Sequence, residues 1–136
     1  MNKILATLTC LVVMAAGAVA GEYPDISIKE LKEAIAAKKV TVIDVNGSES
    51  YAKGHIPSAI DFGAKSEALA SVLPKDKKAL IVAYCGGPTC SAYQKAATAA
   101  EKLGYTNVKH LSAGISGWLQ AGEATEKAKE KDAAKG

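Results

Sequence analysis

Hydrophobic and polar positions divide this chain into alternating segments of two kinds. Nearly continuous apolar or β-branched runs predict buried strands, at residues 40–45, 79–84 and 108–111, with a shorter strand at 59–62. The segments between them predict helices, at residues 28–38, 66–73, 91–103 and 114–121. Strands that alternate with helices form right-handed β-α-β units. We therefore expect an α/β fold with a central parallel sheet flanked by helices.

Two of these helices carry recognisable end signals. Ser27 and Glu30 have the spacing of a capping box, and Leu31 and Ile35 follow on one helical face. Gly104 follows the third helix, where a glycine at the C′ position ends many helices.

The first twenty residues differ from the rest of the chain. Lys3 precedes an apolar run at 4–16, and Ala18 and Ala20 give a small-x-small cleavage site. This arrangement is typical of a secretory signal peptide, so we expect an exported protein, located in a bacterial periplasm. No second apolar run of membrane-spanning length follows, so no stable membrane span is expected.

The mature chain is expected to form one domain and a tail. Residues 21–122 are long enough for a single core. Residues 123–136 balance lysines against acids and contain no large apolar side chain, so we expect this tail to be solvated or disordered.

Charge and composition narrow the function classes. All 17 basic residues are lysines, they are scattered along the chain, and 14 acidic residues balance most of them, so no nucleic-acid footprint is predicted. The absence of arginine from this sequence excludes a site built on a bidentate guanidinium, including the Cys-x5-Arg loop of phosphatases. The distant histidines do not match compact zinc spacing, so no metal site is predicted.

Cys85 is the strongest candidate for chemistry. It stands at the end of the second long strand, before a small-residue turn and the helix at 91–103. A helix N-terminus presents free N–H groups and partial positive charge, which lower a thiol's pKa and also hold an anion. Gly86 and Gly87 allow backbone amides to approach a bound group closely. The alternative is a strand-end cysteine that packs as a small hydrophobe.

Cys90 is the second cysteine of the mature chain, because Cys10 belongs to the leader. One interpretation makes Cys90 a resolving thiol that forms a disulfide with Cys85. Another makes it a small side chain of the first helical turn, with no chemistry. A purely structural disulfide is disfavoured, because so small a loop constrains little of the chain. Thr89 and Ser91 are placed to line the anion cradle or to cap the helix.

Three segments resemble the motifs of rhodanese-like domains. Residues 42–62 (VIDVNGSESYAKGHIPSAIDF) resemble the family's first motif, and residues 84–92 (YCGGPTCSA) resemble its active-site loop. Gly104-Tyr105 followed by residues 108–118 (VKHLSAGISGW) resembles its closing segment. The resemblance runs in order from residue 27 to 122, nearly the whole mature domain.

The resemblance implies a rhodanese-like fold and a sulfurtransferase. It makes Cys85 the nucleophile that carries sulfur as a covalent persulfide, without a further cofactor. The implied anion-binding loop is Gly86, Gly87, Pro88, Thr89, Cys90 and Ser91. It places Asp44 and His55 in a structural motif near the site rather than in acid–base catalysis. The implied donor is thiosulfate or polysulfide, and the implied acceptor is cyanide or a thiol.

One departure from the family's pattern bears on the donor. Many members carry arginine in the loop and after the strand aspartate, at the positions of Gly86 or Cys90 and of Asn46. Without these arginines the sulfonate end of thiosulfate loses a charge-assisted partner. Two other interpretations stay open: a low-turnover sulfur carrier or protein-interaction module with this fold, and a dithiol redox protein that uses Cys85 and Cys90.

Overall fold

The computed structural model describes residues 23–129, and the predicted signal peptide at residues 1–20 lies outside them. Four strands form one sheet: β1 (Val40–Asp44), β2 (Ile60–Asp61), β3 (Leu80–Tyr84) and β4 (Val108–His110). The helices are α1 (Ile28–Ala36), α2 (Ser48–Lys53), α3 (Phe62–Lys65), the 3-10 turn η1 (Ser66–Ala68), α4 (Leu69–Val72), α5 (Tyr93–Lys102) and α6 (Gly114–Gln120). Among the described residues no helix is both long enough and apolar enough to cross a bilayer.

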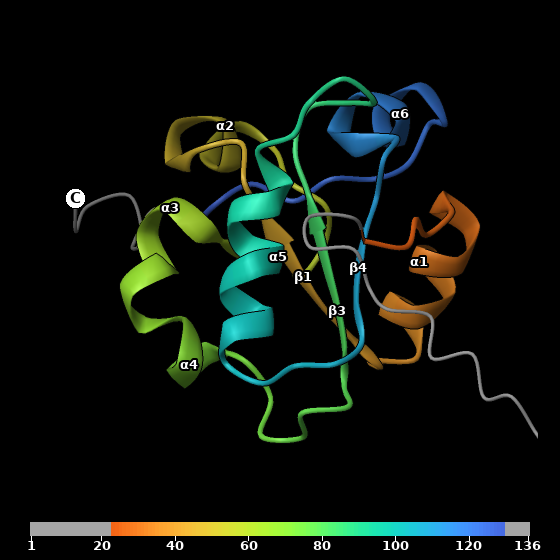
Figure 1. The fold of residues 1–136 in the computed structure, drawn as a ribbon. Helices are drawn as coiled ribbons and strands as arrows, with labels where there is room; N and C mark the ends of the chain where they lie inside the picture. Colours follow the sequence, from red (N-terminus) through yellow and green to blue (C-terminus); the bar gives the residue numbers. More distant parts are fainter. Residues whose placement is uncertain (1–22, 130–136) are drawn as a thin grey trace, which may run out of the picture.

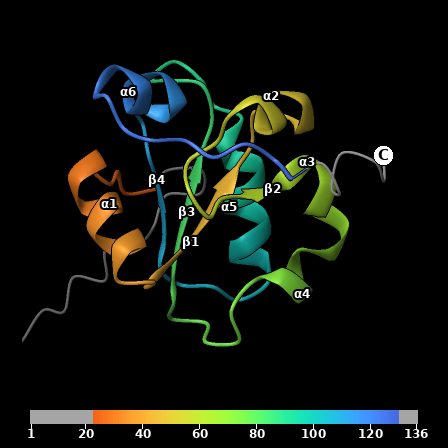
Figure 2. The same ribbon diagram turned by 180° about the vertical axis from the view of Figure 1, so that it is seen from behind.

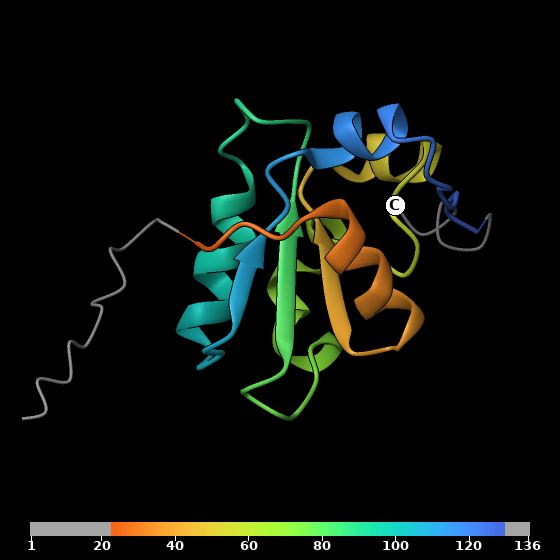
Figure 3. The ribbon, with the colours of Figure 1, turned by 90° about the vertical axis from the view of Figure 1, so that its right-hand side faces the viewer.

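The sheet is parallel throughout, as the sequence predicts, with the strand order β2-β1-β3-β4. Its two long central strands pair along their whole length, from Val40 with Leu80 to Asp44 with Tyr84. Helices cover both faces, and Figures 1 and 2 show α5 on one side and α1 on the other. Figure 3 shows α6 and the loop after β3 at the carboxyl ends of the strands. Ligands of open parallel sheets bind at this end.

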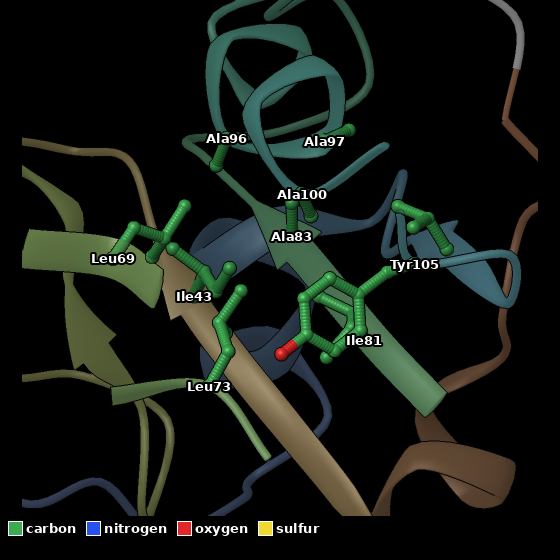
Figure 4. Packing of buried hydrophobic residues seen from close by; sticks show 10 residues of the cluster. Ile43, Leu69, Leu73, Ile81, Ala83, Ala96, Ala97, Ala100 and Tyr105 are labelled. Atoms are coloured by element: carbon green, nitrogen blue, oxygen red, sulfur yellow. The ribbon is translucent and has the colours of Figure 1, made fainter. Parts of the chain in front are cut away.

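Two cores form because side chains of a strand alternate between faces. One face of β1 and β3 packs against α4 and α5 (Figure 4), through Ile43, Leu69, Leu73, Ile81, Ala83, Ala96, Ala97, Ala100, Tyr105 and Val108. The other face packs against α1 and α6, through Ile26, Leu31, Val42, Ile56, Ala59, Val82, Tyr84, Leu111 and Trp118. Three alanines of α5 allow this helix to lie close to the sheet (Figure 4).

The predicted start of α1 and the predicted end of α5 are confirmed, whereas the predicted helix at 66–73 is wrong at its start. Ser27 caps α1 with both hydrogen bonds of the capping box, and Gly104 follows the C-cap of α5 with φ +96°. The predicted helix at 66–73 is a broken series that begins earlier, at Phe62. The Asp61 side chain accepts a hydrogen bond from the N–H of Gly63 and so starts α3 four residues before the predicted helix.

Residues 123–129 differ from the predicted disordered tail. Glu126 forms an antiparallel bridge with His55, in which each backbone N–H donates to the other's carbonyl at 2.9 Å. Trp118 donates its indole N–H to the carbonyl of Ala124 at 2.9 Å. Lys32 pairs with Glu123 at 2.9 Å. Backbone hydrogen bonds need no apolar side chains, so composition gave no signal for them, and most of residues 123–129 are exposed, as the solvated alternative predicts.

Candidate active site

Cys85 lies directly after β3 and is only 3% exposed. Its carbonyl oxygen accepts a hydrogen bond from the N–H of Ile115 at 3.0 Å, and the carbonyl of Gly86 accepts one from Ser116 at 3.0 Å. Both donors belong to the first turn of α6, whose N–H groups have no partner within the helix. The start of α6 therefore fixes the orientation of the peptide groups around Cys85.

Gly114 makes this contact between α6 and the loop possible. Its φ is +61°, and a Cβ atom there would lie 2.6 Å from the backbone nitrogen of Gly87 and 2.7 Å from the carbonyl oxygen of Cys85. No side chain fits at such distances, so only glycine permits the approach. The sequence analysis quoted this glycine within the closing segment but assigned it no part in the site.

The loop after Cys85 turns back on itself. The N–H of Cys90 donates to the carbonyl of Gly87 at 3.0 Å, which closes a tight turn with Pro88 in its second position, where proline's fixed φ is favourable. The turn brings the Cα atoms of Cys85 and Cys90 to 6.3 Å, within the range of a disulfide, and the two sulfur atoms are bonded. The structure thus joins the two cysteines of the predicted site covalently.

Several amides of this loop remain available for an anion. Among the described residues, no backbone carbonyl accepts a hydrogen bond from the N–H groups of Gly86, Gly87, Thr89 or Ser91. Because the carbonyls of Cys85 and Gly86 are bound by α6, an anion near the sulfur meets donors more readily than acceptors. Such an environment favours a thiolate over a thiol.

Helix α5 begins two residues later than predicted, at Tyr93 instead of Ser91. Its N-cap is Ala92, with no side-chain hydrogen bond, so neither Thr89 nor Ser91 caps it. The chain enters the helix through shorter bonds of the 3-10 kind, from the N–H of Gln94 to Ser91 and from Lys95 to Ala92. Both hydroxyl residues instead line the cavity beside Cys85.

A cavity of about 170 Å³ opens beside the disulfide. It is lined by Cys85, Gly87, Pro88, Thr89, Cys90, Ser91, Tyr93, His110, Leu111 and Ser112. Five of the six predicted loop residues are in this lining, and Gly86 is the exception. Its volume suits a small anion and is too small for a drug-sized ligand.

His110 is a cavity residue that sequence reasoning missed, because it looks like an ordinary strand position. In the sheet His110 pairs with Ala83, two residues before Cys85, so the side chains of His110 and Cys85 are directed to the same face. The His110 ring stacks on Tyr93 with centroids 4.3 Å apart. Its Nδ1 donates to the carbonyl of Tyr23 at 2.9 Å, so Nε2 is the nitrogen without this partner: it is an acceptor in the neutral ring and a donor to an anion in the imidazolium form.

Asp44 lies outside the cavity lining, in a buried hydrogen-bond network. Tyr84 donates its hydroxyl hydrogen to Oδ2 at 2.5 Å, and the N–H of Asn46 donates to Oδ1 at 2.7 Å. The Tyr84 oxygen in turn accepts from the N–H of Ile56 at 3.0 Å. Burial raises the pKa of Asp44 and that of Tyr84. The network ties the ends of β1 and β3 to the segment before β2.

His55 has partners of its own and does not line the cavity either. Its Nδ1 donates to the carbonyl of Tyr51 at 2.8 Å, and its ring stacks on that of Tyr51 with centroids 3.7 Å apart. Its backbone pairs with Glu126. No cluster of three or more metal-ligating side chains occurs among residues 23–129.

A sequence profile of the rhodanese-like domain matches residues 27–121. The chain belongs to the rhodanese-like domain family. This shows that the resemblance drawn from three segments extends over the whole described core. The solved structures agree: the rhodanese-like domain of an Anabaena protein has a TM-score of 0.62 at 23% identity, covering 79% of this chain and 81% of that one.

The relatives that this chain matches include a transcriptional regulator and sulfurtransferases. The HTH-type transcriptional regulator Rv0324 of Mycobacterium tuberculosis is 38% identical over 114 residues, 82% of this chain and 49% of the regulator. This chain therefore spans about half the length of that relative. The thiosulfate sulfurtransferase GlpE of Shewanella oneidensis is 28% identical over 102 residues, 73% of this chain and 95% of the enzyme. The human single-domain sulfurtransferase TSTD1 is 25% identical, with a TM-score of 0.57 and coverage of 73% and 97%.

Proposed function

We propose that this rhodanese-like protein is a sulfurtransferase that carries sulfane sulfur as a persulfide on Cys85. The observation that carries the proposal is the position of Cys85, at the end of β3, against a small cavity and among unpaired loop amides. The likeness to the thiosulfate sulfurtransferase of Shewanella oneidensis over nearly that enzyme's whole length supports the same reaction class.

The proposed reaction has two half-steps. The Cys85 thiolate attacks the outer sulfur of thiosulfate, an S–S bond forms on Cys85, and sulfite leaves with the electron pair of the broken bond. Cyanide or a thiolate then attacks the outer sulfur of the persulfide and takes it, which restores the Cys85 thiolate. No metal or organic cofactor takes part, because the sulfur is carried on the protein. The disulfide must be reduced before the first half-step can begin.

The polar groups that line the cavity indicate which sulfur donor the protein prefers. The lining offers backbone N–H groups, two hydroxyls and the His110 imidazole, but no guanidinium or ammonium group. The sulfonate end of the thiosulfate dianion is therefore bound less strongly than at an arginine fork. We propose polysulfide as the better donor and thiosulfate as the weaker one, in an exported, periplasmic protein.

Mass analysis of the loaded protein tests the proposal. The reduced protein is incubated with thiosulfate or with polysulfide, and the peptides are then weighed. We expect one added sulfur on the Cys85 peptide, which cyanide removes as thiocyanate. With thiosulfate, the Cys85→Ser variant should gain no cyanide-labile sulfur. An unmodified Cys85 peptide with both donors, or full sulfur transfer by Cys85→Ser, would refute the proposal.

A dithiol oxidoreductase is the second candidate, and the Cys85–Cys90 disulfide is the observation that favours it. In that case the oxidised protein would oxidise a dithiol substrate, and a small-molecule disulfide supplied as the oxidant would regenerate it, so that turnover needs no sulfur donor. Stoichiometric oxidation in one turnover, together with catalytic thiocyanate formation when donor and cyanide are added, would exclude it.

A further inference from the structure

Resting on the Cys85 persulfide proposed above, we propose that Cys90 is a second catalytic nucleophile, which discharges that persulfide and releases its sulfur as hydrosulfide. The protein would then reduce sulfane sulfur, in addition to passing it to an external acceptor. The partner that this requires is a dithiol reductant, which restores the two thiols after each turnover.

Of the two persulfide sulfurs that Cys90 could attack, only one gives a bond between the two cysteines. A persulfide on Cys85 has an inner sulfur, bonded to Cβ, and an outer sulfur. Attack of the Cys90 thiolate on the outer sulfur would move the persulfide to Cys90. Attack on the inner sulfur gives the Cys85–Cys90 disulfide and expels the outer sulfur. The structure contains that disulfide, and the Cα separation of 6.3 Å allows the two side chains to reach each other.

The step balances without an external oxidant. The Cys90 thiol gives its proton to the outer sulfur of the persulfide anion, and the resulting thiolate forms an S–S bond to the inner sulfur. The bond between inner and outer sulfur breaks, and the outer sulfur leaves as hydrosulfide with that proton and the electron pair of the broken bond. The sulfane sulfur is reduced, and the two cysteines are oxidised to the disulfide. A dithiol then reduces the disulfide, and is itself converted into a disulfide.

Structural stabilisation is a poor explanation for this disulfide. The cysteines are separated by 5 positions, so the bond closes a very short loop. The same turn is already held by the hydrogen bond from Cys90 to Gly87. The carbonyls of Cys85 and Gly86 are held separately by the start of α6. The loop therefore has hydrogen bonds that support its shape besides the covalent bond, as a reversible disulfide requires.

Burial and the surrounding amides indicate which cysteine the dithiol attacks when it reduces the disulfide. Cys85 is buried, whereas Cys90 is half-buried and lies on the turn that also carries the exposed residues Pro88 and Thr89. An incoming thiolate therefore reaches the sulfur of Cys90 first, and the Cys85 thiolate is the leaving group. The unpaired amides around Cys85 stabilise the thiolate that leaves, which speeds exchange in this direction. A mixed disulfide with the reductant would form on Cys90.

The proposed role of Cys90 implies which classes of reaction precede and follow this one. Upstream, a reaction must supply polysulfide or another sulfane-sulfur donor. Downstream, a dithiol–disulfide exchange must supply two electrons for each hydrosulfide released. An external thiophilic acceptor competes with Cys90 for the same persulfide, so the ratio of hydrosulfide to transferred sulfur depends on acceptor concentration.

A single-turnover experiment tests the role of Cys90. Reduced wild-type protein, Cys90→Ser and Cys85→Ser are each loaded with one equivalent of polysulfide, without oxygen, and are desalted to remove excess sulfur species. Hydrosulfide release and protein mass are then followed with no acceptor present. In a parallel arm cyanide is added at once, and thiocyanate reports how much persulfide was loaded.

The wild type should release one hydrosulfide for each persulfide and end as the Cys85–Cys90 disulfide. Cys90→Ser should still form the Cys85 persulfide, which thiocyanate reports, and for each persulfide loaded it should release hydrosulfide at least about 100-fold more slowly than the wild type, because it lacks the neighbouring thiolate. Equal release rates in both proteins, or a persulfide that persists in the wild type, would overturn the role of Cys90 alone. No thiocyanate from either protein would overturn the persulfide itself, and with it both proposals.

A trapping experiment tests which cysteine the reductant attacks when the disulfide is reduced. Oxidised wild-type protein is treated with a limiting monothiol, quenched with acid and digested. We expect the mixed disulfide on the Cys90 peptide. Trapping it mainly on the Cys85 peptide would contradict the assignment of Cys85 as the leaving group.

Discussion

The backbone of Gly114 lies so close to Cys85 that a Cβ atom on Gly114 would stand 2.7 Å from the Cys85 carbonyl oxygen. This contact brings the first turn of α6 against the loop, where Ile115 and Ser116 donate to the carbonyls of Cys85 and Gly86. A glycine that touches no substrate thereby decides which peptide groups face the cavity.

Gly114→Ala should therefore impair both stability and sulfur transfer. The φ of +61° and the contact with backbone atoms of the loop should together cost about 2 to 4 kcal/mol in the free energy of unfolding. Gly122→Ala is the matched control, because Gly122 has φ +76° and no atom lies within 4 Å of the place that its Cβ would take. That control should cost only about 1 kcal/mol and transfer sulfur normally. Denaturant unfolding and thiocyanate formation measure the two effects, and equal losses in both variants would contradict the role of the contact.

His110→Phe should weaken the binding of an anionic donor. Phenylalanine can keep the stacking on Tyr93 but has no nitrogen to face the cavity. The Nε2–H of the imidazolium form donates to the anion, and loss of such a hydrogen bond to a charged group corresponds to an increase of roughly tenfold in KM for thiosulfate. The rate at saturating donor should change much less, because Cys85 remains intact. Steady-state thiocyanate formation at varied thiosulfate separates KM from kcat, and an unchanged KM would remove His110 from the site.

The stability of the wild-type protein relative to its amide variant, Asp44→Asn, should be greatest in acid. Burial raises the pKa of Asp44 above the ordinary value of 3.8, so the folded state binds this proton more tightly than the unfolded state. The stabilising contribution is fully present below 3.8 and is lost as pH rises through the raised pKa of the folded state.

Unfolding free energies of wild type and Asp44→Asn across this pH range check the sign. The difference, wild type minus variant, should fall as pH increases and then become constant. Glu33→Gln, at an exposed position on α1, corrects for the loss of one carboxyl group elsewhere. A difference that rises with pH would mean that the donors Tyr84 and Asn46 outweigh burial.

Removal of residues 123–136 should destabilise the domain more than removal of residues 130–136 alone. The longer deletion loses the two backbone hydrogen bonds between Glu126 and His55, and the one from Trp118 to Ala124. At about 1 kcal/mol each, these bonds predict a difference of roughly 2 to 3 kcal/mol between the deletions. Thermal and denaturant unfolding of both truncated proteins measure it. Equal stabilities of the two truncated proteins would mean that residues 123–129 contribute nothing to stability and behave only as a solvated tail.

Much of the fold follows from local sequence pattern. The runs at residues 40–45 and 79–84 are apolar on both faces, because both faces of a parallel sheet are covered, and they become the two central strands. The Ser27–Glu30 capping box and Gly104 mark helix ends through interactions within a few residues. Cys85 could be singled out in the same way, because a strand, a small-residue turn and a helix follow one another directly in the chain.

What the sequence by itself determined was therefore the α/β class, the family motifs and the position of Cys85, since each depends on neighbouring residues. Only the tertiary structure decided which distant groups meet Cys85. Strand pairing brings His110 to the cavity, and a positive φ at Gly114 brings α6 against the loop. Backbone pairing holds Glu126 on His55, although its segment has no hydrophobic pattern. Such contacts join residues far apart in the chain, and their geometry leaves no periodic signal in the sequence.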